Sequence, residues 1–387
     1  MADPTTPVPE ETPRRTGGIL RKLVQVSLIP ALAVLLGMIA GGIVIVAASV
    51  IDGNPLDLSL PFQAYAAMLQ GALGSADGIV RTLVESTPLI LAGLAVAVGF
   101  KAGLFNIGAN GQFLMGALGA AAVGAAVAHQ SPFVAIPLAL GAGILLSAFY
   151  GFIPGALKAW TGAHEVVTTI MLNIIAASAV SFLVTGPLNA PGFSFARTGD
   201  VGNAAYPTIG DTDFHLGILI AFLAVPVIWW LLNRSVFGFE IRMVGANPSA
   251  ARYAGIRAGR VVILTMSLSA VLAGIAGAGQ VLGLIGFMSA SFSTTAGFDA
   301  ITIALLGRVH PVGVLLASIL FGIMRAGSAL MQIQTRVSVE IIDVIQAMIL
   351  LFLTAEVIVR WIFRIKVQRE ELAELKTITR TYGQAVR

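Results

Sequence analysis

The sequence predicts an all-α polytopic membrane protein, and its composition carries that prediction. Of the 387 residues, 57% are hydrophobic and only 11% are charged, with a mean hydropathy of +0.91. A soluble chain usually has about 25% charged residues, so lipid must be the solvent for much of this surface. The 43 glycines point the same way, because membrane helices use small residues to bring their backbones together.

Apolar runs of about 20 residues, the length that crosses a bilayer, recur along the chain. We predict about ten transmembrane spans, at residues 25–51, 86–100, 108–128, 133–157, 165–186, 214–233, 260–283, 299–308, 311–332 and 340–362. The runs 86–100 and 299–308 are too short to cross alone as straight helices, which predicts discontinuous helices inside a bundle. Residues 62–84 mix apolar positions with charges and predict a helix at the membrane interface.

The distribution of Lys and Arg predicts the orientation of the chain. Basic residues gather in an N-terminal tail at 1–24, in a loop at 234–259 and in a C-terminal tail at 363–387. By contrast, the connection 187–213 carries three aspartates and one arginine. We therefore predict a transmembrane domain over 25–362 with both termini and the basic loop in the cytoplasm.

The basic loop contains the signals of a short capped helix. Asn247 suits the N-cap, Pro248 the first helical position and Gly255 a left-handed end. Two helical turns are marginal alone, so the helix needs something to pack on. Ala250 and Ala251 would give it a small, smooth face. The pattern leaves two interpretations open: a docking surface for another protein, or a connector that touches only its own bundle.

This loop resembles the coupling segment of ABC importer permeases in the ribose and branched-chain amino acid superfamily. Three further stretches, 103–112, 164–173 and 297–308, are similar to the nucleoside and simple-sugar branch of that family. The resemblance implies that the short helix docks on a separate ATPase subunit. It assigns the coupling contacts to Glu240, Gly245, Asn247, Pro248, Ala250, Ala251, Arg252 and Gly255.

The same resemblance implies further partners. The chain would pair with a homologous second permease subunit or with a copy of itself, and an extracytoplasmic substrate-binding protein would deliver the solute. Lipid would surround the bundle, and no nucleic acid is expected. The chain has no cysteine and no Gly-Lys dipeptide, which a P-loop requires. We therefore expect no enzyme activity, metal or cofactor in this chain, with ATP and Mg²⁺ bound by the partner ATPase.

Amides and hydroxyls within apolar sequence are the candidates for a translocation path. An unpaired amide in hydrocarbon costs several kcal/mol, so these side chains must face protein, water or solute. Hydrogen bonding between helices, worth about 0.6 kcal/mol on average, is the interpretation we favour for any single residue. For the group we favour the path, and its members are Asn106, Asn110, Gln112, Thr168, Thr169 and Asn173.

Asp299 and Arg325 are the charges that lie deepest in apolar sequence. An arginine near a helix centre costs about 2.5–3.5 kcal/mol on insertion scales. A buried ion pair of Arg325 with Asp299, Glu340 or Asp343 would offset that cost, so we assign Arg325 a structural role. A pathway role is the alternative, and Asp299 joins the candidates for the path.

These observations predict the permease subunit of an ATP-driven ABC importer. It would move a small polar solute, a nucleoside or a simple sugar, across a bacterial inner or plasma membrane by alternating access. A path of amides and hydroxyls suits such a solute better than an amino acid zwitterion. Two alternatives stay open: a branched-chain amino acid ABC permease, and an ion-coupled secondary transporter, which would need a carboxylate at mid-membrane.

Overall fold

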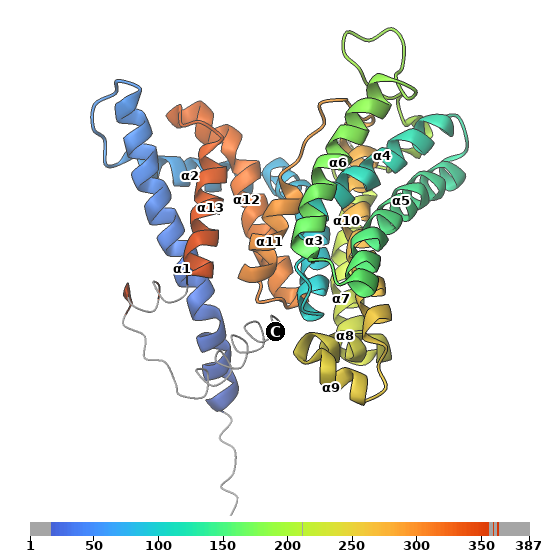
Figure 1. Ribbon diagram of the computed structural model, residues 1–387. Helices are drawn as coiled ribbons and strands as arrows, with labels where there is room; N and C mark the ends of the chain where they lie inside the picture. Colours follow the sequence, from blue (N-terminus) through green and yellow to red (C-terminus); the bar gives the residue numbers. More distant parts are fainter. Residues whose placement is uncertain (1–16, 211, 356–358, 360–361, 364–387) are drawn as a thin grey trace, which may run out of the picture. The chain divides into compact units, whose positions relative to one another are not determined.

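Helices make up the regular structure in the computed structural model, which describes residues 17–210, 212–355, 359 and 362–363 (Figure 1). Within these residues there are thirteen α-helices, one 3-10 turn and one π-helical turn, and no strand beyond isolated bridges, so the all-α prediction is confirmed. The elements are α1 Gly17–Ile51, α2 Leu60–Leu73, α3 Ala76–Lys101, α4 Ala109–Ala126, α5 Pro132–Thr161, α6 Glu165–Thr185, η1 Gly202–Ala204, α7 Leu216–Arg234, α8 Val236–Ala246, α9 Pro248–Tyr253, α10 Ala258–Gln280, η2 Val281–Ile285, α11 Ala296–Leu306, α12 Pro311–Thr335 and α13 Ile341–Thr354. The tails predicted at 1–24 and 363–387 lie mostly outside the described residues.

The chain divides into two compact units, each described by itself. The first consists of residues 1–39 and 348–387, and in its described part Gly37 of α1 lies against Ile349 of α13. A side chain at Gly37 would overlap Ile349, so glycine permits this close approach. The second unit, residues 40–347, contains α2 to α12 complete.

Seven helices of the described chain are long and apolar enough to cross a membrane: α1, α3, α5, α6, α7, α10 with its π-helical turn, and α12. Each matches one predicted span. The remaining predicted spans, 108–128, 299–308 and 340–362, coincide with α4, α11 and α13. The helices α11 and α13 are apolar but have only 11 and 14 residues, and α4 carries two amides in its first turn. These three helices alone do not show a crossing.

Two predictions about the second span are wrong. Residues 62–84 do not form one interfacial helix, and 86–100 is the end of a 26-residue helix rather than a short span. The boundary between α2 and α3 lies at Ser75, whose hydroxyl accepts a hydrogen bond from the Gly78 amide at 3.0 Å as an N-cap. Charged residues in the first turns of α3 explain why hydropathy alone places the start of this span too late.

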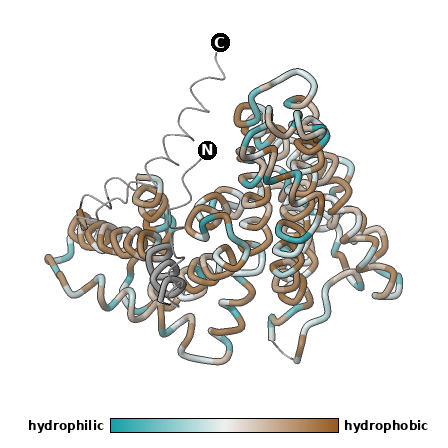
Figure 2. The backbone as a smooth tube through the Cα atoms, turned by 90° about the horizontal axis from the view of Figure 1, so that it is seen from below, coloured by the Kyte–Doolittle hydropathy of each residue, from teal (hydrophilic) through white to brown (hydrophobic). Residues whose placement is uncertain are grey.

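Glycine brings the central helices of the second unit together, as the composition predicted. The helix α10 packs against α3, α4 and α5. A Cβ atom at Gly116 of α4 would overlap the backbone of Gly274 in α10, and one at Gly151 of α5 would meet Ala270. In Figure 2, hydrophobic residues run along most of the helices, and many large hydrophobic side chains are exposed, as a lipid-facing surface requires.

Two helices begin inside the bundle. After α3 the chain turns at Gly103, which has a φ of +70°, and folds back before α4 begins. Residues 286–295, here called the re-entrant segment, lead from the π-helical turn to the start of α11. Gly297 of α11 lies directly against the backbone of Asn110 in α4, so the two helix starts meet. The short apolar run predicted at 299–308 is thus the helix α11, which has 11 residues.

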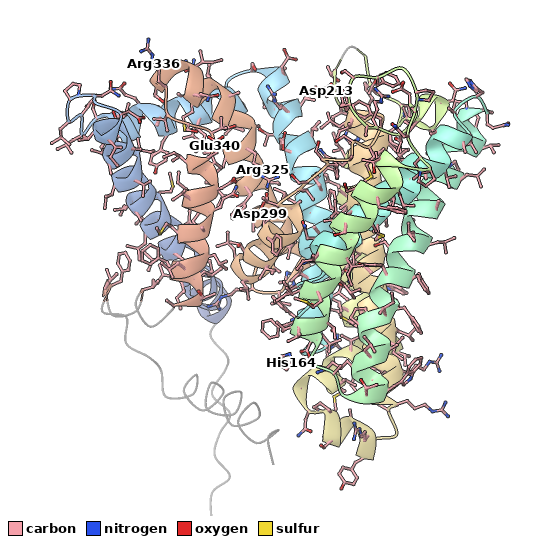
Figure 3. All side chains as sticks on the ribbon, turned by 45° about the horizontal axis from the view of Figure 1, so that its top comes forward. His164, Asp213, Asp299, Arg325, Arg336 and Glu340 are labelled. Carbon is pink, nitrogen blue, oxygen red and sulfur yellow. The ribbon has the colours of Figure 1, made fainter. Side chains whose placement is uncertain are left out.

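The second unit has two ends, which Figure 1 shows on opposite sides. The helices α8 and α9 lie at one, called the α8–α9 end. The connection 186–215 between α6 and α7 lies at the other, called the loop end. Figure 3 places Arg336, at the close of α12, and Asp213 of the connection both towards the loop end.

Candidate functional site

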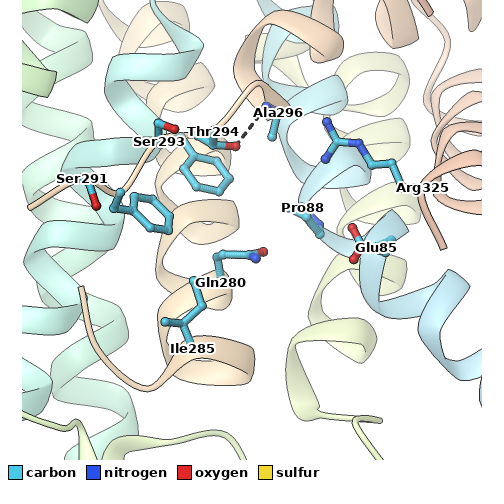
Figure 4. Close-up of a pocket in the computed structure, with 11 residues that line it drawn as sticks. Glu85, Pro88, Gln280, Ile285, Ser291, Ser293, Thr294, Ala296 and Arg325 are labelled. Carbon is cyan, nitrogen blue, oxygen red and sulfur yellow. Dashed lines mark hydrogen bonds between the residues drawn. The ribbon is translucent and has the colours of Figure 1, made fainter. Parts of the chain in front are cut away.

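A polar cavity of about 340 Å³ lies where α3, α4, α10, α11 and α12 meet (Figure 4). Small-molecule pockets in proteins have volumes of about 300–1,000 Å³, so the cavity can hold a small solute. Its wall consists of Glu85, Pro88, Phe113, Gln280, Ile285, Ser291, Phe292, Ser293, Thr294, Ala296 and Arg325.

The re-entrant segment supplies the hydroxyl groups of this wall. The π-helical turn closes α10, and Gly286, with a φ of +79°, turns the chain back into the bundle. Glycine adopts this left-handed conformation without steric cost. Further along, the Thr294 hydroxyl accepts a hydrogen bond from the Ala296 amide at 3.0 Å and fixes the first turn of α11. Serine and threonine side chains are thereby held where a solute could meet them.

Arg325 links the cavity to an ion pair. Its guanidinium contacts the Asp299 carboxylate and donates a hydrogen bond to the Thr295 hydroxyl at 2.8 Å (Figure 3). The side chains of Arg325 and Asp299 are 21% and 16% exposed. Of the three partners considered for Arg325, the structure shows Asp299. Glu85 lies beside Arg325 in Figure 4, so the wall carries charges of both signs beside neutral hydroxyl and amide groups.

The amides Asn106 and Gln112 tie helices together and do not line the cavity. The Asn106 side chain donates to Gln112 Oε1 and to Ser269 Oγ, both at 2.8 Å, and Ser269 donates to the Ala95 carbonyl at 2.6 Å. Asn106 and Gln112 are each 1% exposed. This network joins α3, α4 and α10, which is the helix-to-helix interpretation of these amides.

Asn173 of α6 holds the start of α4. Its Oδ1 accepts from the Gly111 amide at 2.7 Å, and its Nδ2 donates to the Ile107 carbonyl at 3.0 Å. The hydroxyls of Thr168 and Thr169 donate to carbonyls of their own helix. Asn110 packs against α11, and its buried Oδ1 has no hydrogen-bond partner among the described residues. None of the six residues predicted for the path lies on the cavity wall. Their role in the path stays a prediction.

Sequence reasoning missed most of the wall. The signal was present, because residues 289–295 concentrate five hydroxyl side chains in the short gap between two apolar runs. Gln280 is likewise an amide at the end of a span, the same type of residue as Asn106 and Gln112, which the sequence predicts for the path. Glu85 lies between the predicted interfacial helix at 62–84 and the predicted span at 86–100, so misplacing the start of α3 leaves it out of the predicted bundle.

The short capped helix is present at the α8–α9 end as α9. Asn247 Oδ1 accepts hydrogen bonds from the Ser249 and Ala250 amides at 3.0 and 3.1 Å, with Pro248 following as the first helical residue. The predicted smooth face is wrong in one respect, because Ala251 is fully buried while Ala250 is exposed. The outward surface instead carries Arg252 and Tyr253, which is 95% exposed.

The adjoining helix α8 is fixed to the transmembrane helices at Gly245. Its Cα lies so close to the Lys101 carbonyl oxygen, at the end of α3, that a Cβ atom would clash with it. A second cavity, of about 180 Å³, lies beside α8 and α9 and is lined by Glu240, Gly255, Arg257, Arg260 and Val261. Of the predicted coupling residues, Gly245 makes the contact with α3, and Glu240 and Gly255 line this second cavity.

Residues 78–354 match the protein family described as the permease component of branched-chain amino acid transport systems. The chain belongs to this permease family. With seven helices able to cross a membrane, the permease is a multi-pass membrane protein and a transport component.

Several relatives cover almost the whole permease. It is 35% identical over 342 residues to the guanosine ABC transporter permease protein NupP of Bacillus subtilis, which covers 87% of this chain and 95% of the relative. A glucose ABC transporter permease protein of Haloferax volcanii is 35% identical, covering 84% and 86%. The nucleoside ABC transporter permease protein NupB of Lactococcus lactis is 34% identical, covering 86% and 92%. No solved structure matches the permease.

Proposed function

We propose that the chain is the permease subunit of an ABC importer that moves a nucleoside or simple sugar into the cell by alternating access. The cavity carries this proposal. It offers the hydroxyls of Ser291, Ser293 and Thr294 and the amide of Gln280, which can donate to and accept from a neutral polyhydroxylated solute. Relatives named for guanosine, nucleoside and glucose transport support the same solute class.

The membrane arrangement follows from the charges. Arginines gather at the α8–α9 end, which we place in the cytoplasm, and the loop end faces outwards. The helices α4, α11 and α13 then complete ten spans with both termini cytoplasmic. The amides around the start of α4 would form the floor of the path and hold the starts of α4 and α11 in register. A bacterial inner or plasma membrane is the expected location.

Energy would come from another subunit. The exposed side chains Ala250, Arg252 and Tyr253 of α9 offer a projecting contact for an ATPase, which would bind ATP and Mg²⁺ itself. Movement of α9 would reach the spans through the contact between Gly245 and Lys101. A homologous second permease or a copy of this chain would complete the path, and an external binding protein would deliver the solute.

A second candidate function has a specific observation in its favour. Glu85 and Arg325 place a carboxylate and a guanidinium on the same cavity, and such a pair could bind the two charges of an amino acid. The family description names branched-chain amino acid transport. Against this reading, Arg325 already pairs with Asp299, which leaves its positive charge largely compensated.

The test is uptake into proteoliposomes that contain the permease, its ATPase and its binding protein. We expect ATP-dependent uptake of a labelled nucleoside or glucose, with no competition by leucine and no effect of a proton or sodium ionophore. Gln280→Leu should reduce uptake, whereas Gln332→Leu, an exposed amide at the far end of α12, should not. Uptake of leucine alone would establish the second candidate, and uptake abolished by ionophore but not by ATP depletion would reject an ABC importer.

A further inference from the structure

The connection at the loop end and the re-entrant segment form one paired structure. The Thr198 amide donates to the Met288 carbonyl at 2.9 Å, and the Met288 amide donates in return to the Thr198 hydroxyl at 3.0 Å. The Ala290 amide donates to the Ala196 carbonyl at 3.0 Å. Two more amides of the connection, those of Val201 and Tyr206, donate to the carbonyls of Gly286 and Leu282. A surface stretch is thus tied by backbone hydrogen bonds to the segment that lines the cavity.

Arg197 lies at the centre of this pairing and bridges its two sides. Its guanidinium carbon is 4.0 Å from the ring centroid of Phe193 in the connection and 3.7 Å from that of Phe287 in the re-entrant segment. Both distances are well within the range of cation–π attraction. Its Nε donates to the Thr198 carbonyl at 3.1 Å, and its other end pairs with Asp200. Only 7% of Arg197 is exposed.

The two segments that Arg197 joins face different surroundings. Within the re-entrant segment, the residues of the cavity wall begin at Ser291, two residues after Ser289, the bridge partner of Arg197. On the other side, Phe193 is 48% exposed and the Asp200 side chain 66% exposed, so a protein outside the membrane can reach them. Arg197 therefore joins the exposed part of the connection to the segment that carries the hydroxyls of the cavity wall.

We propose that Arg197 is a positioning residue that couples the outer connection to the cavity wall, so that the docked binding protein sets the position of residues 291–294. This inference rests on the proposed importer function. It assigns a role to a buried cation that neither contacts the cavity nor belongs to the α8–α9 end. Binding of the solute-loaded partner to the connection would shift the wall towards the arrangement that accepts the solute.

The first test compares ATP hydrolysis by the complete reconstituted importer with and without its solute-loaded binding protein. Arg197→Lys keeps the charge but loses the planar group that stacks between two rings. We expect unchanged basal hydrolysis and a loss of about fivefold or more in the stimulation by the binding protein, the usual lower range of coupling between sites. Arg336→Lys, an exposed arginine at the loop end of α12, is the matched control and should behave as wild type.

The second test replaces the contacts of Arg197 by a covalent bond between the two segments. Arg197 and Ser289 form an antiparallel bridge pair flanked by hydrogen bonds, whose Cα atoms are typically about 4.5 Å apart and suit a disulfide. The chain has no cysteine of its own. In Arg197→Cys/Ser289→Cys we expect stimulation to be lost under reduction and restored after oxidation with diamide. Arg197→Cys alone should show the loss without the restoration.

Unchanged stimulation in Arg197→Lys would overturn the proposal. So would a parallel fall of basal and stimulated hydrolysis together with the thermal midpoint, since that pattern means a purely structural role. Failure of the oxidised double variant to regain stimulation would also count against coupling through this pair. A wild-type importer without ATP-dependent uptake would instead reject the proposed function, and the two failures are therefore distinguishable.

Discussion

The ion pair between Arg325 and Asp299 gives a prediction that separates a structural role from a pathway role. Arg325→Met removes the guanidinium but keeps much of the apolar stem, and Asp299→Asn removes the negative charge with little change of shape. Each single variant leaves one charge without its partner inside the bundle. The double variant leaves none, so its cost should be smaller than the sum of the two single costs.

The burial of the two side chains sets the magnitude. Removing one partner of a fully buried pair costs about 3–5 kcal/mol, and an exposed pair is worth about 0–1 kcal/mol. With exposures of 21% and 16%, the pair lies between these limits, and we expect about 2 kcal/mol for each single variant. The coupling between the two changes should be about 1 kcal/mol or more. Unfolding entropy of about 2.1 cal/mol/K per residue over 387 residues turns 2 kcal/mol into a fall of roughly 2–3 °C in the thermal midpoint.

The assay is thermal unfolding of the permease in lipid nanodiscs, followed by tryptophan fluorescence, together with uptake of two competing solutes. The account predicts lower midpoints for both single variants, partial recovery in the double variant and an unchanged preference between solutes. Midpoints equal to wild type, or shifts that simply add, would refute the pair as a stabilising contact. A changed solute preference at an unchanged midpoint would show that Arg325 selects the solute from the cavity wall instead of stabilising the fold.

Three further predictions concern other parts of the permease. In Gly245→Val the new side chain meets the backbone of Lys101, so we expect a loss of stability of about 1–3 kcal/mol and loss of ATPase coupling in co-purification and hydrolysis assays. Gly141→Val, which has open space around it, should behave as wild type in both assays. Normal coupling in Gly245→Val would reject the contact with Lys101 as the point of transmission. Asn106→Leu removes both hydrogen bonds between Asn106 and the Gln112 side chain and the one donated to Ser269, so the thermal midpoint should fall by the equivalent of about 1–3 kcal/mol. A wild-type midpoint would contradict the network. Burial lowers the pKa of His215 below its ordinary value of 6.5, and its Nδ1 accepts a hydrogen bond from the Gly217 amide. As the pH falls, the unfolded chain therefore binds the proton before the folded chain does. The free energy of unfolding should keep its full value above about pH 6.5 and decrease at lower pH. His215→Asn keeps an acceptor and should flatten that fall in midpoints measured between pH 7.5 and 5.5, while an identical slope in both proteins would exclude His215 as its source.

Local patterns in the sequence predicted local structure well. The lengths of the apolar runs located the long helices, because the bilayer thickness fixes how many residues a span needs. Asn247 and Pro248 located the start of α9, since an N-cap acts within three residues of its own position. The short run 299–308 predicted a helix too short to cross the membrane alone, and α11 has 11 residues.

The cavity could not be predicted in the same way, because its wall comes from stretches of the chain up to 240 residues apart, from Glu85 to Arg325. Periodicity shows that an amide such as Asn106 must avoid lipid, but not whether it meets another helix or a solute. The start of α3 was missed for a related reason. Its first turns carry charges that are unfavourable in lipid and acceptable at the loop end, and hydropathy alone does not distinguish these surroundings.

The central claim is that the solute passes through the cavity bounded by the re-entrant segment, and thiol protection tests it most directly. Because the chain has no cysteine, Ser293→Cys places a single thiol on the cavity wall, and Ser131→Cys places one on the exposed start of α5 as a control. The measurement is the rate of labelling by a small methanethiosulfonate reagent in the complete importer, with and without solute-loaded binding protein and ATP. The account predicts that transported solute slows labelling of Ser293→Cys and leaves Ser131→Cys unchanged. Equal labelling rates of Ser293→Cys with and without solute, in an importer that is transporting, would contradict it.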